Sequence, residues 1–240
     1  ARSAGWARRE RRERTGRVML RTAVASAAFA LVALASAAWL THDFRTWTQE
    51  AARRYEVAQA PVPAPAVEML VPGVGQRALV DLLAADGAVT LVDFVYTDCR
   101  SVCAALGTAF QQLQARIRAG EAEATGAARA PVRLLSISFD PARDDVATLA
   151  RYASALNARA DTWRFATVAD ARRLEPLLRR FRVVVIPDGL GGFEHNAALL
   201  VVDQRGRLVR IFDYDRIDDA LGFARAIAER GADGRGGVDG

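Results

Sequence analysis

Two cysteines separated by three residues are the part of this 240-residue chain best suited to chemistry. Cys99 and Cys103 follow an apolar segment in the order FVYTDCRSVCAAL, and a spacing of four places both sulfurs on one face of a helix. The unpaired N–H groups at a helix start stabilise thiolates, and Arg100 adds positive charge there. The pair is suited to disulfide exchange or to binding a soft metal ion. The alternative is a purely structural disulfide, which would stabilise little because the closed loop is so short.

His195 is the third residue with ligand chemistry, in a loop ahead of a predicted C-terminal hairpin. If the hairpin after His195 and the apolar segment before Cys99 belong to one sheet, this loop approaches the start of the cysteine-bearing helix. Two thiolates and one imidazole form a three-coordinate set suited to copper, with thiolate favouring Cu(I) and imidazole tolerating both oxidation states. The alternative for His195 is an ordinary surface residue. We interpret His42 as a residue at a membrane interface and Met69 as a packing residue.

The composition excludes several other kinds of site. Two Cys and two His are too few for a zinc ribbon or a multi-disulfide framework. All 33 basic residues are Arg, so a lysine nucleophile, a Schiff base and a P-loop are excluded. Hydrophobic residues make up 51% of the chain, enough for a sizeable packed core.

The net charge of +5 is located in the N-terminal tail. Residues 1–21 hold eight Arg and two Glu, which leaves 25 Arg against 26 acidic residues in the rest of the chain. A nucleic-acid-binding domain would carry its basic charge on its fold, so we expect no nucleic-acid partner.

An uncharged run of 19 residues from Thr22 to Leu40 is long enough to cross a bilayer as a helix. The arginine-rich flank precedes it, which predicts a cytoplasmic N-terminus and a C-terminal domain on the periplasmic side of a bacterial inner membrane. A cleaved signal peptide is the alternative. Alternating prolines in Ala60–Pro65 then favour an extended spacer.

These features divide the chain into five parts. We predict a basic cytoplasmic tail, a single transmembrane helix, a stalk with a Pro-rich linker, an α/β domain of the thioredoxin-like class and a disordered tail, over residues 1–21, 22–40, 41–66, 67–230 and 231–240.

Within the domain, apolar periodicity predicts the order β-α-β-α-β-α-β-β-α and a sheet with mixed strand directions. The predicted strands are 89–96, 132–139, 165–168, 183–186, 197–202 and 208–212, and the predicted helices are 101–118, 145–156, 170–181 and 217–230. Asp144 or Asp145 is expected to cap the second of these helices, and Asp140 and Arg143 to form a surface ion pair in the turn before it.

Several motifs together resemble the Sco/SenC proteins. The segment FVYTDCRSVC ending at Cys103 is similar to their copper-site motif, SISFDPARD ending at Asp144 to their second block, and Glu194-His195 to a later block. The resemblance implies a membrane-tethered thioredoxin-like domain that binds copper, as Cu(I) or Cu(II), through Cys99, Cys103 and His195. It also implies a role in assembling the CuA centre of cytochrome c oxidase, with subunit II or another copper protein as client.

The chain departs from the family pattern beside the cysteines, where Arg100 and Ala104 replace prolines, and after His195, where Asn196 stands in place of serine. Two further functions therefore stay open. One is a periplasmic thiol–disulfide oxidoreductase acting on the cysteines of a metalloprotein client, with Cys99 and Cys103 as the redox dithiol. The other is a binding or sensor domain with a structural disulfide. Copper coordination requires His195, whereas disulfide exchange does not.

Overall fold

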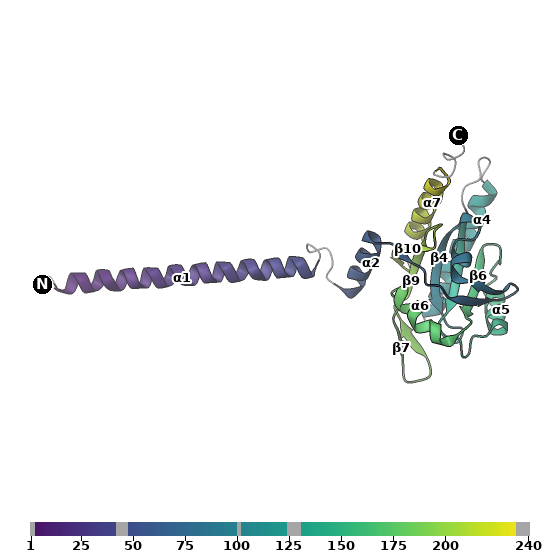
Figure 1. Cartoon of the computed structure of the whole chain (residues 1–240), viewed down its shortest axis with the longest axis horizontal. Coiled ribbons are helices and arrows are strands. Elements are labelled where there is room, and N and C mark those ends of the chain that lie inside the picture. The colour runs from purple at the N-terminus through teal and green to yellow at the C-terminus, as the bar shows by residue number, and fades with distance from the viewer. Residues whose placement is uncertain (1–2, 42–47, 100–101, 124–130, 234–240) are drawn as a thin grey trace. The chain divides into compact units, whose positions relative to one another are not determined.

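The computed structural model describes residues 3–41, 48–99, 102–123 and 131–233. The chain forms two compact units, residues 1–55 and residues 56–240 (Figure 1). Cys103 and Ala104 lie in a described helix, while Arg100 and His42 lie outside the described residues.

The first unit is dominated by one long helix, α1, from Ser3 to Leu40. Its stretch Gly16–Leu40 is the one segment among the described residues that is long and apolar enough to cross a membrane. The predicted span of residues 22–40 lies within it. The unit also contains the start of α2, Gln49–Gln59.

The second unit is a mixed sheet covered by helices on both faces, as the sequence predicts. Its main sheet has eight strands in the order β1-β10-β9-β4-β5-β6-β2-β3, of which β4, β5 and β6 run parallel. A separate antiparallel pair, β7–β8, stands apart from this sheet. The strands are β1 Val62–Pro63, β2 Glu68–Val71, β3 Gly75–Ala78, β4 Val89–Val95, β5 Val132–Ser138, β6 Trp163–Val168, β7 Val185–Pro187, β8 Phe193–His195, β9 Ala198–Val202 and β10 Arg207–Asp213. The helices are α3 Leu79–Leu83, α4 Val102–Glu123, α5 Val146–Ala155, α6 Leu174–Arg180 and α7 Ile217–Asp233, with 3-10 turns at Ala85–Gly87 and Ala171–Arg173.

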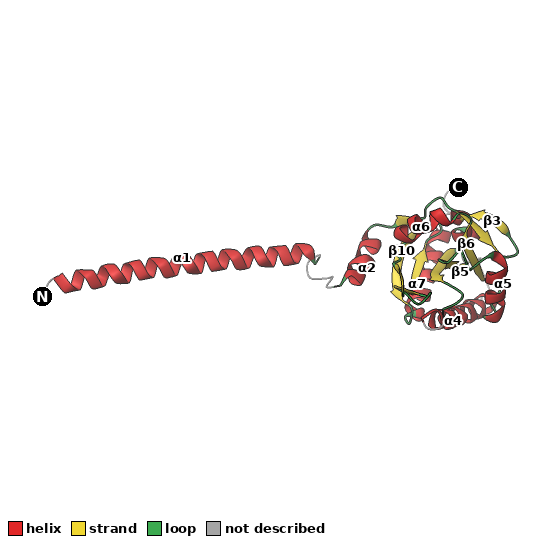
Figure 2. Cartoon of the chain, turned by 90° about the horizontal axis from the view of Figure 1, so that it is seen from below, coloured by secondary structure: helices red, strands yellow, loops and turns green. Residues whose placement is uncertain are grey.

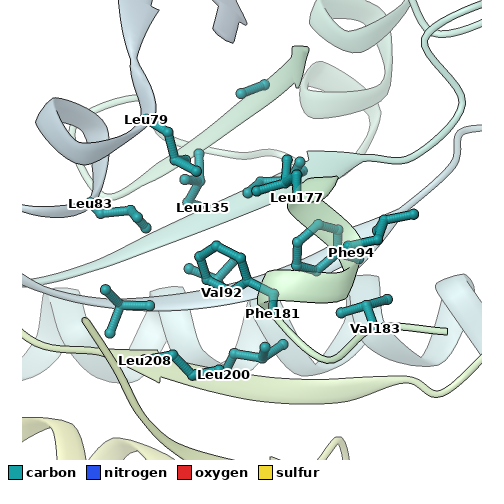
Figure 3. Close-up of a cluster of buried hydrophobic side chains, with 14 of the residues drawn as sticks. Leu79, Leu83, Val92, Phe94, Leu135, Leu177, Phe181, Val183, Leu200 and Leu208 are labelled. Atoms are coloured by element: carbon teal, nitrogen blue, oxygen red, sulfur yellow. The ribbon is translucent and has the colours of Figure 1, made fainter. Parts of the chain in front are cut away.

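The central strand β4 is buried along its whole length because helices cover both sides of the sheet (Figure 2). Val92 and Phe94 face one core together with α3 and α6, where Phe94 packs on Phe181 with ring centroids 5.7 Å apart (Figure 3). Val89 and Leu91 face the other core, which α4 and α7 cover. The strand is therefore apolar on both faces apart from Thr90 and Asp93, and its C-terminal end leads into the turn that carries Cys99.

The Pro-rich segment takes part in the fold of the second unit. Val62 and Pro63 form β1 and pair with Leu208 and Arg207 of β10. Ala64 donates its N–H to the Gly206 carbonyl at 2.9 Å. Proline is compatible with this place because β1 is an edge strand. Residues 62–64, which the sequence assigns to a free linker, are thus part of the sheet.

The strands and helices predicted from periodicity are present, with shifted ends. Helix α4, which carries Cys103, continues to Glu123, five residues past its predicted end. Helix α7 continues to Asp233, into the segment assigned to the tail. Strands β2 and β3 were absent from the sequence interpretation, although the Pro72-Gly73 pair between them is a turn signal. Gly73 adopts a φ of 73°, which favours glycine there.

Candidate functional site

Cys99 lies in a turn immediately after the central strand. Its N–H donates to the Tyr96 carbonyl at 3.3 Å, and its half-buried side chain packs against the core that faces α3 and α6. Cys103 is the second residue of α4. The two cysteines thus flank the start of α4, where backbone N–H groups without helical partners favour a thiolate.

A buried carboxylate holds this turn in place. Asp144, 1% exposed, accepts the Thr97 N–H at 3.0 Å and the Thr97 hydroxyl at 2.5 Å. The Ser138 hydroxyl donates to the same carboxylate at 2.6 Å. Hydrogen bonds to a buried charged acceptor are among the stronger ones in proteins, so the backbone two residues before Cys99 is fixed to the end of β5.

Asp145, and not Asp144, caps α5. The Asp145 side chain accepts the Thr148 N–H at 2.7 Å, and the backbone of Asp145 is extended, as expected of an N-cap. This choice resolves the two options that the sequence left open.

His195 is the last residue of β8, in the β7–β8 hairpin, where it pairs with Val185. The tip of this hairpin is organised by Asp188, whose carboxylate accepts the N–H groups of Leu190 at 2.7 Å and Gly192 at 2.9 Å. The segment before His195, predicted as a loop, is therefore a structured hairpin tip that leads directly to His195.

The sheet topology brings the cysteine turn and the histidine hairpin to one end. Strand β9 runs antiparallel to β4, with Val92 opposite Leu200 and Thr90 opposite Val202. The beginning of β9, which follows His195, therefore lies beside the end of β4, which precedes Cys99. The Phe193 N–H donates to the Tyr96 hydroxyl at 3.3 Å, which links the two segments directly.

An aromatic cluster of Tyr96, Phe139, Phe193 and His195 fills the space between these segments. The Phe139 ring centroid lies 5.2 Å from Tyr96, 5.6 Å from Phe193 and 5.1 Å from the His195 imidazole. Tyr96 and Phe193 meet edge to face at 5.3 Å. Cys99 and Phe193 pack against the same core, which contains Tyr96 and Phe139. The Cys99 and His195 side chains thus belong to one apolar neighbourhood.

Burial sets the protonation state of the histidine. Desolvation lowers the pKa of His195 to about 4, because the apolar surroundings disfavour the charged imidazolium. At neutral pH the imidazole is therefore neutral, which is the form that binds a metal ion.

Two of the three predicted ligands, Cys99 and His195, are described with their side chains, and Cys103 is placed by its backbone. Among the described side chains, no three of the His, Cys, Asp and Glu type are grouped as a metal site. Cys99 lies in the turn before α4, which begins at Val102, so the expectation that both sulfurs share one face of a helix does not hold for Cys99. The role of Cys99, Cys103 and His195 as ligands remains a prediction.

One buried group was not singled out from the sequence. Asp93 lies in β4 opposite Ser136, 1% exposed, and its carboxyl oxygens have no hydrogen-bond partner among the described residues. Burial raises the pKa of Asp93 to about 7, and the nearby Ser136 hydroxyl offsets this only in part. Ser136 itself accepts the Trp163 indole N–H at 2.9 Å. In the sequence, Asp93 is the one charged residue in the mostly apolar segment Val89–Val95, and this pattern could have identified it as a buried acid.

The chain is similar to known proteins. The SCO1/SenC family model matches residues 76–229. The SCO1 protein homolog of Bacillus subtilis is 26% identical over 142 residues, which covers 58% of this chain and 68% of that protein.

Solved structures of Sco proteins share the fold. BsSco, described as a member of the Sco family of cytochrome c oxidase assembly proteins with a disulfide switch, gives a TM-score of 0.59 at 20% identity, covering 70% of this chain and 95% of its own. Yeast Sco1 with copper bound gives a TM-score of 0.56 at 16% identity, covering 75% of this chain and 96% of its own. These likenesses establish the thioredoxin-like Sco fold. Because the family model spans well over half of the chain and includes both the cysteine turn and the histidine hairpin, this protein belongs to the SCO1/SenC family.

Proposed function

We propose that this chain is a membrane-tethered copper carrier for the assembly of cytochrome c oxidase, with Cys99, Cys103 and His195 as the copper ligands. Proteins of the Sco family bind copper and take part in the assembly of this oxidase. Copper in this proposal is a cargo that the chain receives and passes on.

The observation that carries the proposal is the convergence of the cysteine turn and the histidine hairpin on one aromatic cluster. Thiolate sulfur selects soft ions such as Cu(I), and imidazole nitrogen supports both Cu(I) and Cu(II). The neutral state of His195 at physiological pH leaves a nitrogen lone pair for the metal. The half-buried setting of Cys99 and His195 limits access of water while leaving room for transfer to a client.

The client that fits this chemistry best is the CuA site of oxidase subunit II, which receives copper outside the cytoplasm. The candidate span Gly16–Leu40, with the arginine-rich segment before it, supports our proposal that the copper domain faces the periplasm from the inner membrane.

A second function is favoured by the position of the cysteines at the start of α4. A reduced Cys99–Cys103 pair could transfer two electrons to a disulfide of the client, becoming a disulfide itself while the client gains two thiols. This reaction would prepare the recipient cysteines without any need for His195.

One experiment separates the two functions. The gene is replaced by wild type, His195→Ala or Cys99→Ser in its own host, and the CuA content of the isolated oxidase is measured from its absorption and its EPR signal. The copper carrier predicts loss of CuA in both variants. If His195→Ala retains full CuA content while Cys99→Ser loses it, the oxidoreductase function replaces the carrier.

A further inference from the structure

Arg143 connects the segments that carry the candidate ligands. It lies in the turn between β5 and α5, and its Nε donates to the Asp140 carboxylate. Its Nη1 donates to the Gly191 carbonyl at 2.8 Å and lies 4.0 Å from a carboxylate oxygen of Asp98. Its guanidinium carbon lies 5.5 Å from the centroid of the Phe193 ring.

Three of the four residues that Arg143 contacts lie close in sequence to a candidate ligand. Asp98 immediately precedes Cys99, while Gly191 and Phe193 lie four and two residues before His195. The guanidinium therefore touches both the cysteine turn and the histidine hairpin.

The anchor of this side chain is rigid. The Asp140 side chain is 8% exposed, and the Asp140 N–H donates to the Ser138 hydroxyl at 3.0 Å. Ser138 also donates to Asp144, the residue that holds Thr97. Asp144 thus connects the cysteine turn to the end of β5, and the adjacent Arg143 connects the β7–β8 hairpin to the same end of β5.

The hairpin needs such a contact because β7 and β8 form their own two-stranded sheet and are not hydrogen-bonded into the main one. Polar contacts that reach the hairpin from the body of the domain include the Tyr96 hydroxyl at Phe193 and Arg143 at Gly191. The planar guanidinium of arginine has several N–H donors and a flat face, so it can donate to Asp140 and Gly191 while lying against the Phe193 ring. A lysine ammonium has no stacking face and a shorter reach.

We propose that Arg143 is a positioning residue of the copper site, which holds the His195 hairpin against the Cys99 turn so that the imidazole is preset for the metal. This inference rests on the proposed function. The sequence alone assigned Arg143 a surface ion pair with Asp140. That ion pair exists, and the same side chain extends beyond it to the hairpin.

Losing Arg143 should affect both fold stability and copper affinity. The Arg143 side chain is 43% exposed but its partner Asp140 is 8% exposed, so a neutral residue at position 143 leaves a nearly buried carboxylate without its ion pair. The effect on copper should come through the His195 imidazole, which loses its fixed position. Cu(II), which depends on nitrogen, should be affected more than Cu(I), for which two sulfurs suffice.

The test uses the full chain in detergent, with Arg143→Met, Arg143→Lys, His195→Ala and the control Arg151→Met. Arg151 is an exposed arginine of α5 whose Nη2 donates to the Thr148 hydroxyl at 2.9 Å. Cu(II) affinity, the Cu(II) EPR spectrum and Cu(I) affinity are measured, together with the thermal midpoint.

We expect Arg143→Met to weaken Cu(II) binding by about tenfold, the equivalent of one charge-assisted hydrogen bond, and to broaden or reduce the nitrogen hyperfine pattern. Cu(I) affinity should stay close to wild type, the thermal midpoint should fall because Asp140 loses its ion pair, and Arg151→Met should change neither. Arg143→Lys keeps the charge beside Asp140, and we expect it to recover only part of the Cu(II) affinity. It is the deciding variant if Arg143→Met does not fold.

Two results would count against the inference in different ways. If both Arg143 variants bind Cu(II) with the affinity and spectrum of wild type while His195→Ala does not, the positioning role is wrong and the proposed function stands. If His195→Ala also leaves Cu(II) binding unchanged, the assignment of His195 as a ligand fails, and the positioning role fails with it.

Discussion

The Asp144 carboxylate accepts both the backbone N–H and the hydroxyl of Thr97, a residue 47 positions earlier in the chain. This pair joins the end of the central strand to the turn after β5. Cys99 follows Thr97 by two residues, so the Asp144 carboxylate, which lies on another segment, helps to fix the position of the cysteine turn.

Replacing that carboxylate should loosen the turn. We expect Asp144→Asn to lower the free energy of unfolding by about 2–3 kcal/mol, because the amide loses the charge and presents its own N–H groups to Thr97 or Ser138. Urea unfolding of the full chain in detergent, followed by near-UV circular dichroism, measures the change. The matched control is Asp145→Asn, since asparagine is an equally good N-cap for α5 and should cost little. Equal losses in the two variants would contradict the role given to Asp144.

Asp93 should make stability depend on pH. Its pKa is about 7 in the folded protein and 3.8 in a reference peptide, so between these values the folded state holds more protons than the unfolded state. The contribution of this group is therefore fully present at and below about pH 4, is lost as the pH rises to about 7, and then levels off. The full difference is on the order of 4 kcal/mol at most.

The amide side chain of the variant Asp93→Asn does not titrate. The free energy of unfolding of this variant should therefore change less between pH 5 and pH 8 than that of wild type. Denaturation midpoints at four or five pH values across this range provide the measurement. Parallel pH profiles for the two proteins would show that Asp93 is not the titrating group.

The second unit should need residues upstream of the predicted domain start. Val57 is 1% exposed in the core that faces α3 and α6, and Val62–Pro63 forms an edge strand. Burying a valine contributes about 1.5–3 kcal/mol, so a fragment beginning at residue 67 should be less stable than one beginning at residue 48. Thermal unfolding of both fragments tests this, and identical midpoints would show that residues 48–66 are dispensable.

The orientation of the chain can be tested in cells. With the arginine-rich segment in the cytoplasm, residues after Leu40 should lie in the periplasm. Alkaline phosphatase fused after Arg230 should then be active, because this enzyme folds only where disulfides form. Activity of a cytoplasmic reporter at the same position, with an inactive phosphatase fusion, would reverse the topology.

Much of the fold follows from periodicity in the sequence. The run Val89–Val95 is apolar on both faces, which predicts a central strand, and α4 shows apolar positions three and four residues apart. Short edge strands such as Val62–Pro63 and Glu68–Val71 have too few residues to show a period, and they are held by pairing with distant strands.

The candidate site was predictable only in part for the same reason. Residue type and spacing indicated Cys99 and Cys103, and the position of His195 ahead of the predicted hairpin indicated the imidazole. The contacts of Asp144 with Thr97 and of Arg143 with Gly191 join residues 47 and 48 positions apart, and no local pattern reports them. Asp145 as the cap of α5, by contrast, satisfies a local rule and was among the predicted options.

The most direct test of the central claim is a competition titration of the reduced full chain in detergent against a chromophoric Cu(I) chelator. Wild type is compared with Cys99→Ser, Cys103→Ser, the double Cys variant and His195→Ala, and Cu(II) binding is followed in parallel. The account predicts one Cu(I) per wild-type chain, loss of most of the affinity on removing either sulfur, and a His195→Ala defect that is larger for Cu(II) than for Cu(I). Wild type binding Cu(I) no more tightly than the double Cys variant would contradict the account.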